Sequence, residues 1–500
     1  MNFTRRDALK IGAATVLATP PLATPTRAAG RATESEMTAL TAVEAAGWIS
    51  RGEMTAEAYV STLLARAERL KDLDVFIALN NEGALSAARA IDLRRKKKQK
   101  LGLLAGVPLI VKDNIDAAGL AATAGCRGLA ENRPSKNAPV LVPLLAADGI
   151  LLGKANMHEL ADGITSNNGG YGAVHNPYNT SMIPGGSSGG TAAGIAARIA
   201  PAGLGTDTAG SVRIPSSLCG VAGLRPTSKR YSLEGIVPLS HTRDTAGPIA
   251  RTVADVALLD AVITGSPATP RASLSGLRLG LPREYFWVDL DPETETVMNE
   301  AIRRLKDLGV VFVEASPAGL ADLTRRAGNT IGYEMLRDIA AYLAADHSTV
   351  TVDAMIQGIK SPDVVRAVAR IKSNPADEAA YNETVNKWRP QLQQLYADYF
   401  AKNNVEAMFF PTTPLPARPI GEDQTVDLNG KKVSTIGTYT RNAAPGSSAG
   451  MPGLTLPAGR GKSGLPIGME LDGPMGSDRK LLAIGIAMEA HLGPLPAPSV

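Results

Sequence analysis

The chain has 500 residues, enough for one large core or for two to three domains of average size. Its composition is that of a soluble globular protein: 44% of residues are hydrophobic and 20% are charged, and no run of 18 apolar residues could span a bilayer. The net charge of +4 is too small for this length to indicate a nucleic-acid partner. We therefore expect no nucleic acid, no integral membrane segment, and a monomer or homodimer.

The first 29 residues have the pattern of a targeting segment. Arg5 and Arg6 are followed by an apolar run over residues 11–17 and by Ala28 and Ala29. A basic region, a short apolar region and small residues, in this order, are typical of a twin-arginine export signal. A tail that happens to hold two arginines is the alternative. The signal predicts a periplasmic protein whose folded part is residues 30–500.

Strand and helix patterns alternate in the next part of the chain. Thr55 is placed to cap a helix whose apolar residues recur at helical spacing. The apolar run at 107–111 predicts a buried strand, residues 139–148 predict a helix, and residues 150–152 predict a second strand. This alternation favours an α/β fold with a central sheet flanked by helices.

Composition also divides the remainder of the chain. Residues 185–223 are rich in glycine, alanine and serine, but apolar residues interrupt the glycines, so we expect this segment to pack. Residues 264–275 are the most linker-like, a helix-rich charged block follows, and residues 405–411 predict a strand that returns to the core. We expect one α/β core with a helical insertion, over about 36–265 and 403–490 for the core and about 276–402 for the insertion.

Cysteine and histidine spacing gives no sign of a metal centre. Cys126 and Cys219 form no C-x-x-C pair, and the five histidines are too far apart along the chain for a local ligand motif. We therefore expect no structural zinc and no cofactor. Two buried thiols are the expected state of the cysteines, and a single disulfide between them is the alternative.

The run Pro184–Gly190 contains two overlapping G-x-S-x-G motifs, centred on Ser187 and on Ser188. In an α/β-hydrolase this motif follows a hydrophobic strand and works with an acid and a late histidine. Residues 179–184 make a poor strand, and His347 and His491 have no supporting context, which disfavours Ser188 as an elbow nucleophile. A phosphate-binding loop is excluded because no lysine follows the glycines in the required place.

Ser211 ends a second stretch of small residues. The backbone N–H groups of the four residues that end it could converge on one point, as an oxyanion hole requires: Thr208, Ala209, Gly210 and Ser211. Loss of one such donor typically slows catalysis about 10²–10³-fold. A serine whose own N–H belongs to the hole is well placed to be a nucleophile. A plain helix N-cap before Val212 is the alternative.

Lys112 comes directly after the predicted strand at 107–111. A lysine at a strand end is ordinarily a surface residue that extends its amine into water. If it is buried instead, its pKa falls and the neutral amine can accept a proton. Since no histidine lies near these motifs in the sequence, a serine hydrolase built here needs another base, and Lys112 can fill that role.

In combination these segments resemble the signature of the amidase signature family. The resemblance runs from about residue 36 to 490 and is carried, in order and spacing, by Val111–Asn114, Gly153–Asn156, Gly185–Gly190, Gly205–Pro215, Cys219-Gly220, Gly223–Pro226 and Phe410–Thr413. It implies the amidase signature fold, a mixed sheet flanked by helices, and hydrolysis of amide C–N bonds without a metal or cofactor.

The resemblance also implies a role for each residue of the site. Ser211 would be the nucleophile, Ser187 the bridging serine after a cis peptide bond, and Lys112 the base, with Ser188 a less essential neighbour. Ala209 stands where the family usually has glycine. We expect its methyl group to affect the choice of acyl group rather than the chemistry.

Three further segments resemble the branch of indoleacetamide and mandelamide hydrolases: Met157–Gly172, Val237–Thr252 and Arg441–Gly459. This implies a small carboxamide substrate of the arylacetamide type or with another apolar acyl group. The alternatives are an exported esterase or a peptide-amide hydrolase using the same site, and a periplasmic binding protein without chemistry. The aminoacyl-tRNA amidotransferase A subunit also belongs to the family, but its tRNA and partner subunits are cytoplasmic, which conflicts with export.

Overall fold

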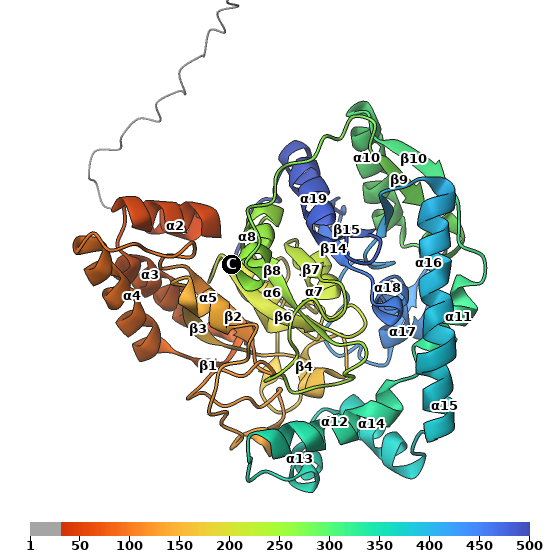
Figure 1. The fold of residues 1–500 in the computed structure, drawn as a ribbon, viewed down its shortest axis with the longest axis horizontal. Coiled ribbons are helices and arrows are strands. Elements are labelled where there is room, and N and C mark those ends of the chain that lie inside the picture. The colour runs from red at the N-terminus through yellow and green to blue at the C-terminus, as the bar shows by residue number, and fades with distance from the viewer. Residues whose placement is uncertain (1–31) are drawn as a thin grey trace, which may run out of the picture.

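The computed structural model describes residues 32–500, so the predicted export signal at 1–29 lies outside the described residues and stays a prediction. A sheet of eleven strands forms the centre of the described chain (Figure 1). In spatial order its strands are β1 (Phe76–Leu79), β3 (Ile150–Ala155), β2 (Pro108–Lys112), β6 (Ala202–Asp207), β8 (Thr245–Ala250), β7 (Ala222–Arg225), β14 (Gly453–Arg460), β15 (Pro466–Asp472), β11 (Ala407–Pro411), β9 (Arg278–Leu281) and β10 (Val311–Glu314).

The sheet is mixed, as the sequence predicted. β2 is parallel to both β3 and β6, and β9 is parallel to both β10 and β11. The other neighbouring pairs are antiparallel. Two small hairpin sheets lie outside it and consist of β4 (Asn167–Asn168) with β5 (Gly172–Ala173) and β12 (Thr425–Leu428) with β13 (Lys431–Ser434).

Helices cover both faces of the sheet. In chain order they are α1 (Glu34–Ala39), α2 (Ala42–Arg51), α3 (Ala56–Arg69), α4 (Asn81–Lys96), α5 (Val142–Ala146), α6 (Gly189–Ala196), α7 (Arg213–Leu218), α8 (Val253–Thr264), α9 (Arg283–Phe286), α10 (Pro292–Asp307), α11 (Leu320–Ala327), α12 (Ile331–Ala345), α13 (Val352–Gly358), α14 (Pro362–Ser373), α15 (Glu378–Glu383), α16 (Arg389–Asn403), α17 (Thr435–Thr440), α18 (Ala444–Ala449) and α19 (Asp478–Leu492).

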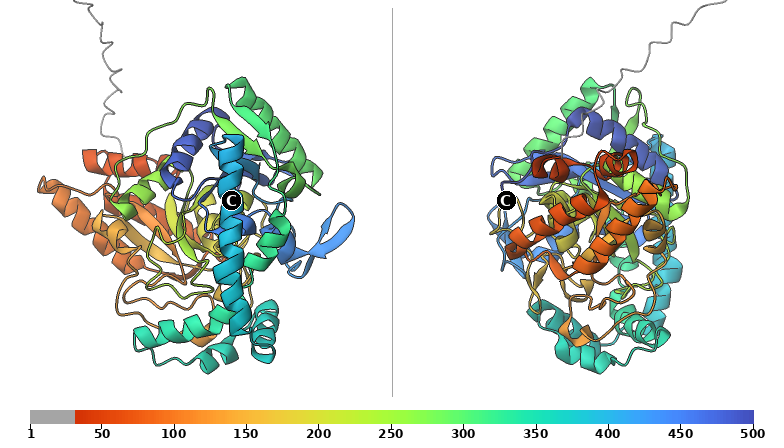
Figure 2. Two further views of the ribbon diagram at one scale, coloured as in Figure 1. Left: turned by 45° about the vertical axis from the view of Figure 1, so that its right-hand side comes forward. Right: turned by 90° about the vertical axis from the view of Figure 1, so that its left-hand side faces the viewer.

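Neighbouring residues of β14 show which helices lie on which face. Gly453 lies against the Arg213 side chain of α7, whereas Leu454 lies against Gly485 of α19. Successive side chains of a strand point to opposite faces, so α7 and α19 cover opposite faces. α6 packs beside α7, and α8 packs beside α19. The N-terminal helices α2–α4 lie together at the left of Figure 1, on the side that faces the viewer in Figure 2 (right), and α4 packs against β3.

Several predicted elements are confirmed. α3 begins after Thr55, whose side chain accepts a hydrogen bond from the Ala58 amide. The segment 185–223 packs into the core as α6, β6, α7 and β7, and the strand expected at 405–411 is β11. The helix expected at 139–148 is shorter, because only Val142–Ala146 is helical, with Pro143 in its first turn.

The block at 276–402 differs from a purely helical insertion. Its first strands, β9 and β10, extend the central sheet because β9 pairs in parallel with β11. The remainder is helical, and α12, α13 and α14 lie together at the bottom of Figure 1. Apolar side chains of these helices pack against the loops at 124–129, 157–161 and 237–239. The insertion therefore both lengthens the sheet and covers loops near the predicted site.

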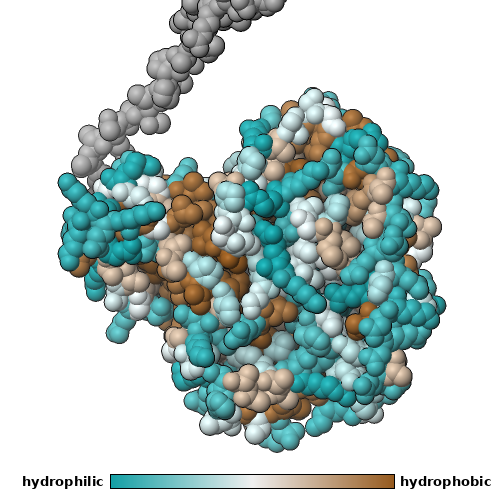
Figure 3. Space-filling model, viewed as in Figure 1, coloured by the Kyte–Doolittle hydropathy of each residue, from teal (hydrophilic) through white to brown (hydrophobic). Residues whose placement is uncertain are grey.

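On the face seen in Figure 3, the broadest apolar area lies near α5, and the Val142 side chain of this helix is half-exposed. Among residues 32–500, no helix combines the length and the apolar character needed to cross a membrane.

Glycine in β6 allows the close approach of β2, and this gives a prediction for stability. A Cβ at Gly203 would lie 2.2 Å from the Ile110 carbonyl oxygen. We expect Gly203→Ala to lower the free energy of unfolding by about 1–3 kcal/mol, because the backbone must shift to relieve this overlap. Thermal unfolding followed by circular dichroism measures the effect.

Gly332→Ala is the matched control because it adds the same methyl group where the nearest atom, Ala376 Cβ, is 3.8 Å away. Gly332 lies in α12, so alanine should leave stability equal or raise it by up to about 1 kcal/mol. Equal unfolding temperatures for the two variants would contradict the packing argument.

Candidate active site

Lys112 is fully buried at the end of β2 and is not a surface residue. Its Nζ lies 2.7 Å from Ser187 Oγ and 2.7 Å from Thr206 Oγ1. Asn114 Nδ2 donates to the same Thr206 hydroxyl at 3.1 Å. The sequence analysis did not single out Thr206, although it lies two residues before Thr208. The structure therefore brings together two of the three predicted residues, Lys112 and Ser187, in one hydrogen bond.

Burial changes the chemistry of the Lys112 amine. Removal from water lowers the pKa of Lys112 to about 7, while the negative charges of Asp207 and Asp244 act in the opposite direction. No carboxylate among the described residues lies within ion-pair distance of Nζ, so burial prevails. Near neutral pH a large share of Lys112 is an uncharged amine with a free lone pair.

The turn that carries Ser187 contains a cis peptide bond between Gly186 and Ser187. Gly186 is tightly enclosed, because a Cβ there would lie 2.8 Å from Ser166 Oγ. Ser166 Oγ also donates to the Gly185 carbonyl at 2.9 Å, and it accepts the Gly189 amide at 3.2 Å. The His158 amide donates to the Ser187 carbonyl at 3.1 Å. The loop at 158–166 thus holds the Ser187 turn from outside.

Ser211 lies between β6 and α7, at the opposite side of the same turn. The Ser188 amide donates to the Ser211 carbonyl at 3.2 Å, which ties the two serine-bearing segments together. Ser211 is 6% exposed, whereas Ser187 has no exposed surface. Solvent can therefore reach Ser211 but not Ser187.

The loop from Thr208 to Ser211 has free amides, with one exception. The Gly210 amide donates to Asp207 Oδ1 at 2.8 Å, so it is engaged within the protein and is not a free donor as the sequence analysis expected. The amides of Thr208, Ala209 and Ser211 have no hydrogen-bond partner among residues 32–500. Gly210 has φ +119°, a conformation that favours glycine. Ala209 is not among the described residues with positive φ, so its side chain imposes no backbone strain there.

Asp207 is the charged support of this loop, and the sequence analysis missed it. Its Oδ1 accepts from Gly210, and its Oδ2 accepts the Val212 amide at 3.2 Å. Arg213 Nε donates to Oδ2 at 3.0 Å, and Arg225 Nη1 donates to Oδ1 at 2.9 Å. Burial alone would raise the pKa of Asp207, but the two guanidinium groups and the amides lower it well below its usual range.

The charge cluster continues into β15. Arg213 also pairs with Glu470 and lies 3.8 Å from Asp472, and all three side chains are fully buried. Burial raises the pKa of Glu470, although Arg213 acts in the opposite direction, and burial together with the Glu470 charge raises the pKa of Asp472 well above its usual value. The signal in the sequence was Glu470 and Asp472 alternating with apolar residues in a core strand.

A second buried lysine anchors the segment that follows Lys112. Lys154 Nζ donates to the carbonyls of Asp113 and Ala121 at 3.2 and 3.1 Å and lies 3.6 Å from Asp113 Oδ1. Asp113 Oδ2 accepts the Thr123 amide at 3.0 Å. This explains the matching V-K-D-N and G-K-A-N segments: one lysine lies at the site, and the other fixes the loop leaving it.

The hydrolase-elbow alternative finds no support in this geometry. Ser188 Oγ donates to the Thr206 carbonyl at 3.2 Å and accepts the Thr206 amide at 3.3 Å. No strand directly precedes the turn, and neither His347 nor His491 shares a hydrogen bond with Ser188 in the described chain. Ser188 therefore braces β6.

Both cysteines are free buried thiols, as expected, and the disulfide alternative is wrong. Burial raises the pKa of Cys126 to about 12 and raises that of Cys219 further, so neither is a thiolate at neutral pH.

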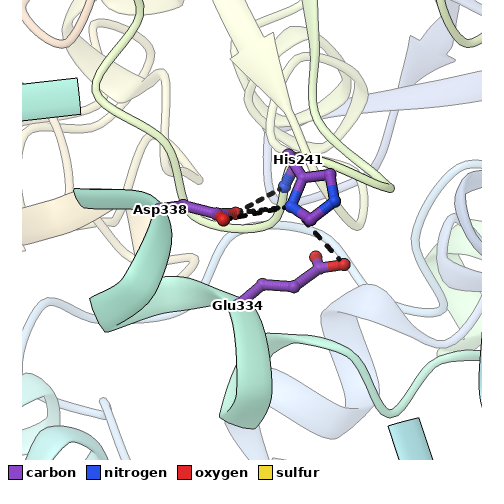
Figure 4. A group of neighbouring side chains, drawn as sticks. All are labelled: His241, Glu334 and Asp338. Carbon is purple, nitrogen blue, oxygen red and sulfur yellow. Dashed lines mark hydrogen bonds and ion pairs between the residues drawn. The ribbon is translucent and has the colours of Figure 1, made fainter. Parts of the chain in front are cut away.

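One group of side chains among the described residues could hold a metal ion. His241, Glu334 and Asp338 offer ligand atoms within 4.8 Å of one another (Figure 4). Their carboxylates already accept hydrogen bonds from the protein: Asp338 from the His241 amide at 3.0 Å, and Glu334 from the Tyr381 hydroxyl at 2.7 Å. The first contact joins α12 to the loop at 239–244, and the second joins α12 to α15.

Comparison with known proteins identifies the family. The amidase family pattern matches residues 58–482. The chain belongs to the amidase family. It is 44% identical over 437 residues to the indoleacetamide hydrolase of Rhizobium radiobacter, covering 87% of this chain and 93% of that protein. It is 36% identical over 479 residues to the mandelamide hydrolase of Pseudomonas putida, covering 92% and 93%.

The fold agrees with the family. A crystal structure of an amidase matches with a TM-score of 0.81 at 32% identity, covering 91% of this chain and all of that one. The predicted family and fold class are therefore confirmed, and this amidase-family member is a hydrolase of amide C–N bonds.

Asp207→Asn tests whether the charge of the Asp207 carboxylate stabilises the loop at 208–212. The change preserves the shape of the side chain but removes the charge that compensates Arg213 and Arg225, both fully buried. We expect the free energy of unfolding to fall by about 3–5 kcal/mol, because a buried charge is left uncompensated. Urea unfolding followed by tryptophan fluorescence measures it.

Asp322→Asn is the matched control, because Asp322 pairs with Arg325 and Arg326 on the surface of α11. Its unfolding midpoint should equal that of the wild type. If Asp207→Asn were as stable as Asp322→Asn, the buried ion pairs would not hold the loop.

Proposed function

We propose that the protein is a serine amidohydrolase that converts a small carboxamide to a carboxylate and ammonia or an amine through an acyl-enzyme. The observation that carries this proposal is the 2.7 Å contact between Lys112 Nζ and Ser187 Oγ, in a site without water access to either atom. Membership of the amidase family supports the reaction type.

The first half of the proposed reaction is a proton relay. The neutral Lys112 amine accepts the proton of Ser187, while Ser187 Oγ accepts the proton of Ser211. Ser211 Oγ then bonds to the carbonyl carbon of the substrate. Of the three relay residues only Lys112 gains charge, and the carboxylates of Asp207 and Asp244 favour this charge from a distance.

The negative charge that develops on the carbonyl oxygen needs donors that are already in place. The amides of Ala209 and Ser211 are the free donors nearest the nucleophile in sequence, with that of Thr208 next. The proposed hole therefore uses these three amides rather than the Gly210 amide, which Asp207 occupies.

The second half reverses the relay. The proton on Lys112 returns through Ser187 to the leaving nitrogen, which breaks the C–N bond and leaves an ester on Ser211. Water then gives its proton to the same relay, attacks the ester and restores the Ser211 hydroxyl. The net reaction is amide plus water to acid plus amine, with the enzyme unchanged.

The proposed substrates are primary amides of arylacetic-type acids or of other apolar acids. Relatives named for indoleacetamide and mandelamide hydrolysis, at 44% and 36% identity, support this class. The methyl group of Ala209 does not strain the backbone, because Ala209 does not have a positive φ. The methyl group therefore acts in the loop through its size.

A substrate panel with one serine variant tests the function. We expect wild-type protein to release ammonia from arylacetamides faster than from aliphatic or peptide C-terminal amides, and Ser211→Ala to lose activity by at least about 10³-fold. The loss follows because no other hydroxyl can form the acyl-enzyme. Ammonia release and labelling by a fluorophosphonate measure the two effects.

Ser188→Ala is the matched control, since its hydroxyl only contacts Thr206 backbone, and it should still be labelled. Labelling of Ser211→Ala but not of Ser188→Ala would reassign the nucleophile. A folded wild-type protein that releases nothing from the panel and binds an amide unchanged would favour a binding protein. A higher kcat/KM for matched esters would favour an esterase.

The pKa of Lys112 predicts how kcat/KM depends on pH. Because the pKa of Lys112 is lowered to about 7 and only the neutral amine accepts a proton, kcat/KM should rise with pH through about 7 and then level off. Below that pH each unit should cost about tenfold. A profile that stays flat from about pH 5.5 to 8.5 would contradict Lys112 as the base.

A further inference from the structure

The loop at 239–244 precedes β8. One of its carboxylates contacts the proposed oxyanion loop, residues 208–212. Asp244 Oδ1 accepts a hydrogen bond from Thr208 Oγ1 at 2.5 Å. Asp244 Oδ2 accepts the amides of Leu239 and Ser240 at 2.8 and 2.9 Å. One buried carboxylate therefore joins two loops that are more than 30 residues apart in sequence.

The two halves of the oxyanion loop are held by different residues. Asp207 binds the amides of Gly210 and Val212, which fixes the second half. In the first half, the contact with Asp244 is the only hydrogen bond that Thr208 makes within residues 32–500, and Ala209 makes none there. The positions of the Thr208 and Ala209 amides therefore depend on the Thr208 hydroxyl and on Asp244.

Asp244 is itself held from outside by the insertion. Glu334 of α12 accepts hydrogen bonds from the hydroxyls of Ser240 and, at 3.1 Å, Thr242. Asp338, one turn further along α12, accepts the His241 amide and lies 2.9 Å from His241 Nδ1, so the three side chains converge in Figure 4. Arg243 Nη1 donates to the Gly328 carbonyl at 2.8 Å. Consecutive residues of the loop are thus tied to the segment at 328–338.

These contacts indicate that the His241, Glu334 and Asp338 side chains fix the loop at 239–244 to α12 rather than form a metal centre. Glu334 is fully buried and its two oxygens accept from three hydroxyl groups, those of Ser240, Thr242 and Tyr381. A cation at this place would have to displace donors that are already satisfied. The physical use of the cluster is to fix the loop that presents Asp244.

We infer that Asp244 is a positioning residue: held by α12 through the loop at 239–244, it sets the first half of the oxyanion loop through the Thr208 hydroxyl. The inference rests on the proposed function, because it assumes that the amides beside Thr208 stabilise the transition state. It assigns to the insertion a part in catalysis without direct contact with the substrate.

Thr208→Val is the decisive variant, since it removes the hydroxyl donor while it preserves the shape of the side chain. We expect kcat to fall about 10- to 100-fold, because misplaced donors act on the transition state more than on bound substrate, and KM to change less than about threefold. Thr208→Ser restores the donor and should recover most of the lost kcat. Rates are divided by the concentration of active sites, titrated with a fluorophosphonate, so that a smaller folded fraction does not lower them.

A double-mutant cycle tests the part played by Asp244. If Asp244 acts through this hydroxyl, Thr208→Val should cost less than about twofold when it is introduced into Asp244→Ala. Equal fold losses in both backgrounds, or wild-type kcat per active site in Thr208→Val, would overturn the inference. A Thr208→Ser enzyme as slow as Thr208→Val would overturn it too, since the donor would then not matter.

The wild-type protein separates this inference from the proposed function. Labelling of wild type but not of Ser211→Ala supports the function, and the Thr208 variants then decide the inference alone. Wild type that is neither labelled nor active on amides overturns both. Activity that requires added zinc and is lost with His241→Ala would mean that the cluster is a metal site. It would overturn the inference that the cluster serves to fix the loop at 239–244.

Discussion

Asp207 ends β6 with a carboxylate that is removed from water, and two buried arginines and two amides of the loop that carries Ser211 all depend on it. Burying these charges is costly, and close pairing offsets the cost only when the geometry is complete. The partners come from different parts of the fold: Arg213 begins α7 and Arg225 ends β7, and Arg213 also pairs with Glu470 of β15. A single carboxylate thereby couples the packing of three sheet strands and one helix to the shape of the loop that carries Ser211.

Asp207 and Lys112 are both buried, but they differ in ionisation. Asp207 favours the charged form of this lysine, but it lies beyond ion-pair distance of the amine. Arg213 and Arg225 pair with the Asp207 carboxylate, while burial lowers the pKa of Lys112 to about 7. The site thus holds a carboxylate that stays charged and a lysine whose pKa is about 7 among buried groups. The two groups differ because Asp207 has two guanidinium groups within hydrogen-bond distance, whereas Lys112 has no carboxylate within ion-pair distance among the described residues.

Local sequence patterns predicted the residues that define the site, but not those that support them. Ser187, Ser211 and Lys112 lie in short motifs, so their spacing indicated a common chemistry. Thr206, Asp207 and Asp244 act through contacts between strands and loops, which one-dimensional spacing does not reveal. The Gly210 amide was assigned to the oxyanion hole because it is adjacent to Ser211, whereas the side chain of Asp207 occupies it. β9 and β10 were missed for a related reason: β9 joins the sheet by pairing with β11, more than 120 residues later, and β10 joins it by pairing with β9.

The partners of Arg213 also set an order of events during synthesis. Its guanidinium binds the Ala443 carbonyl, the Ser447 hydroxyl and the Glu470 carboxylate, all near the end of the chain. A nascent polypeptide that has emerged only as far as β11 contains both serines and the lysine, but it lacks the groups that complete the surroundings of Asp207. The surroundings of the loop at 208–212 are therefore complete only after nearly the whole polypeptide has left the ribosome.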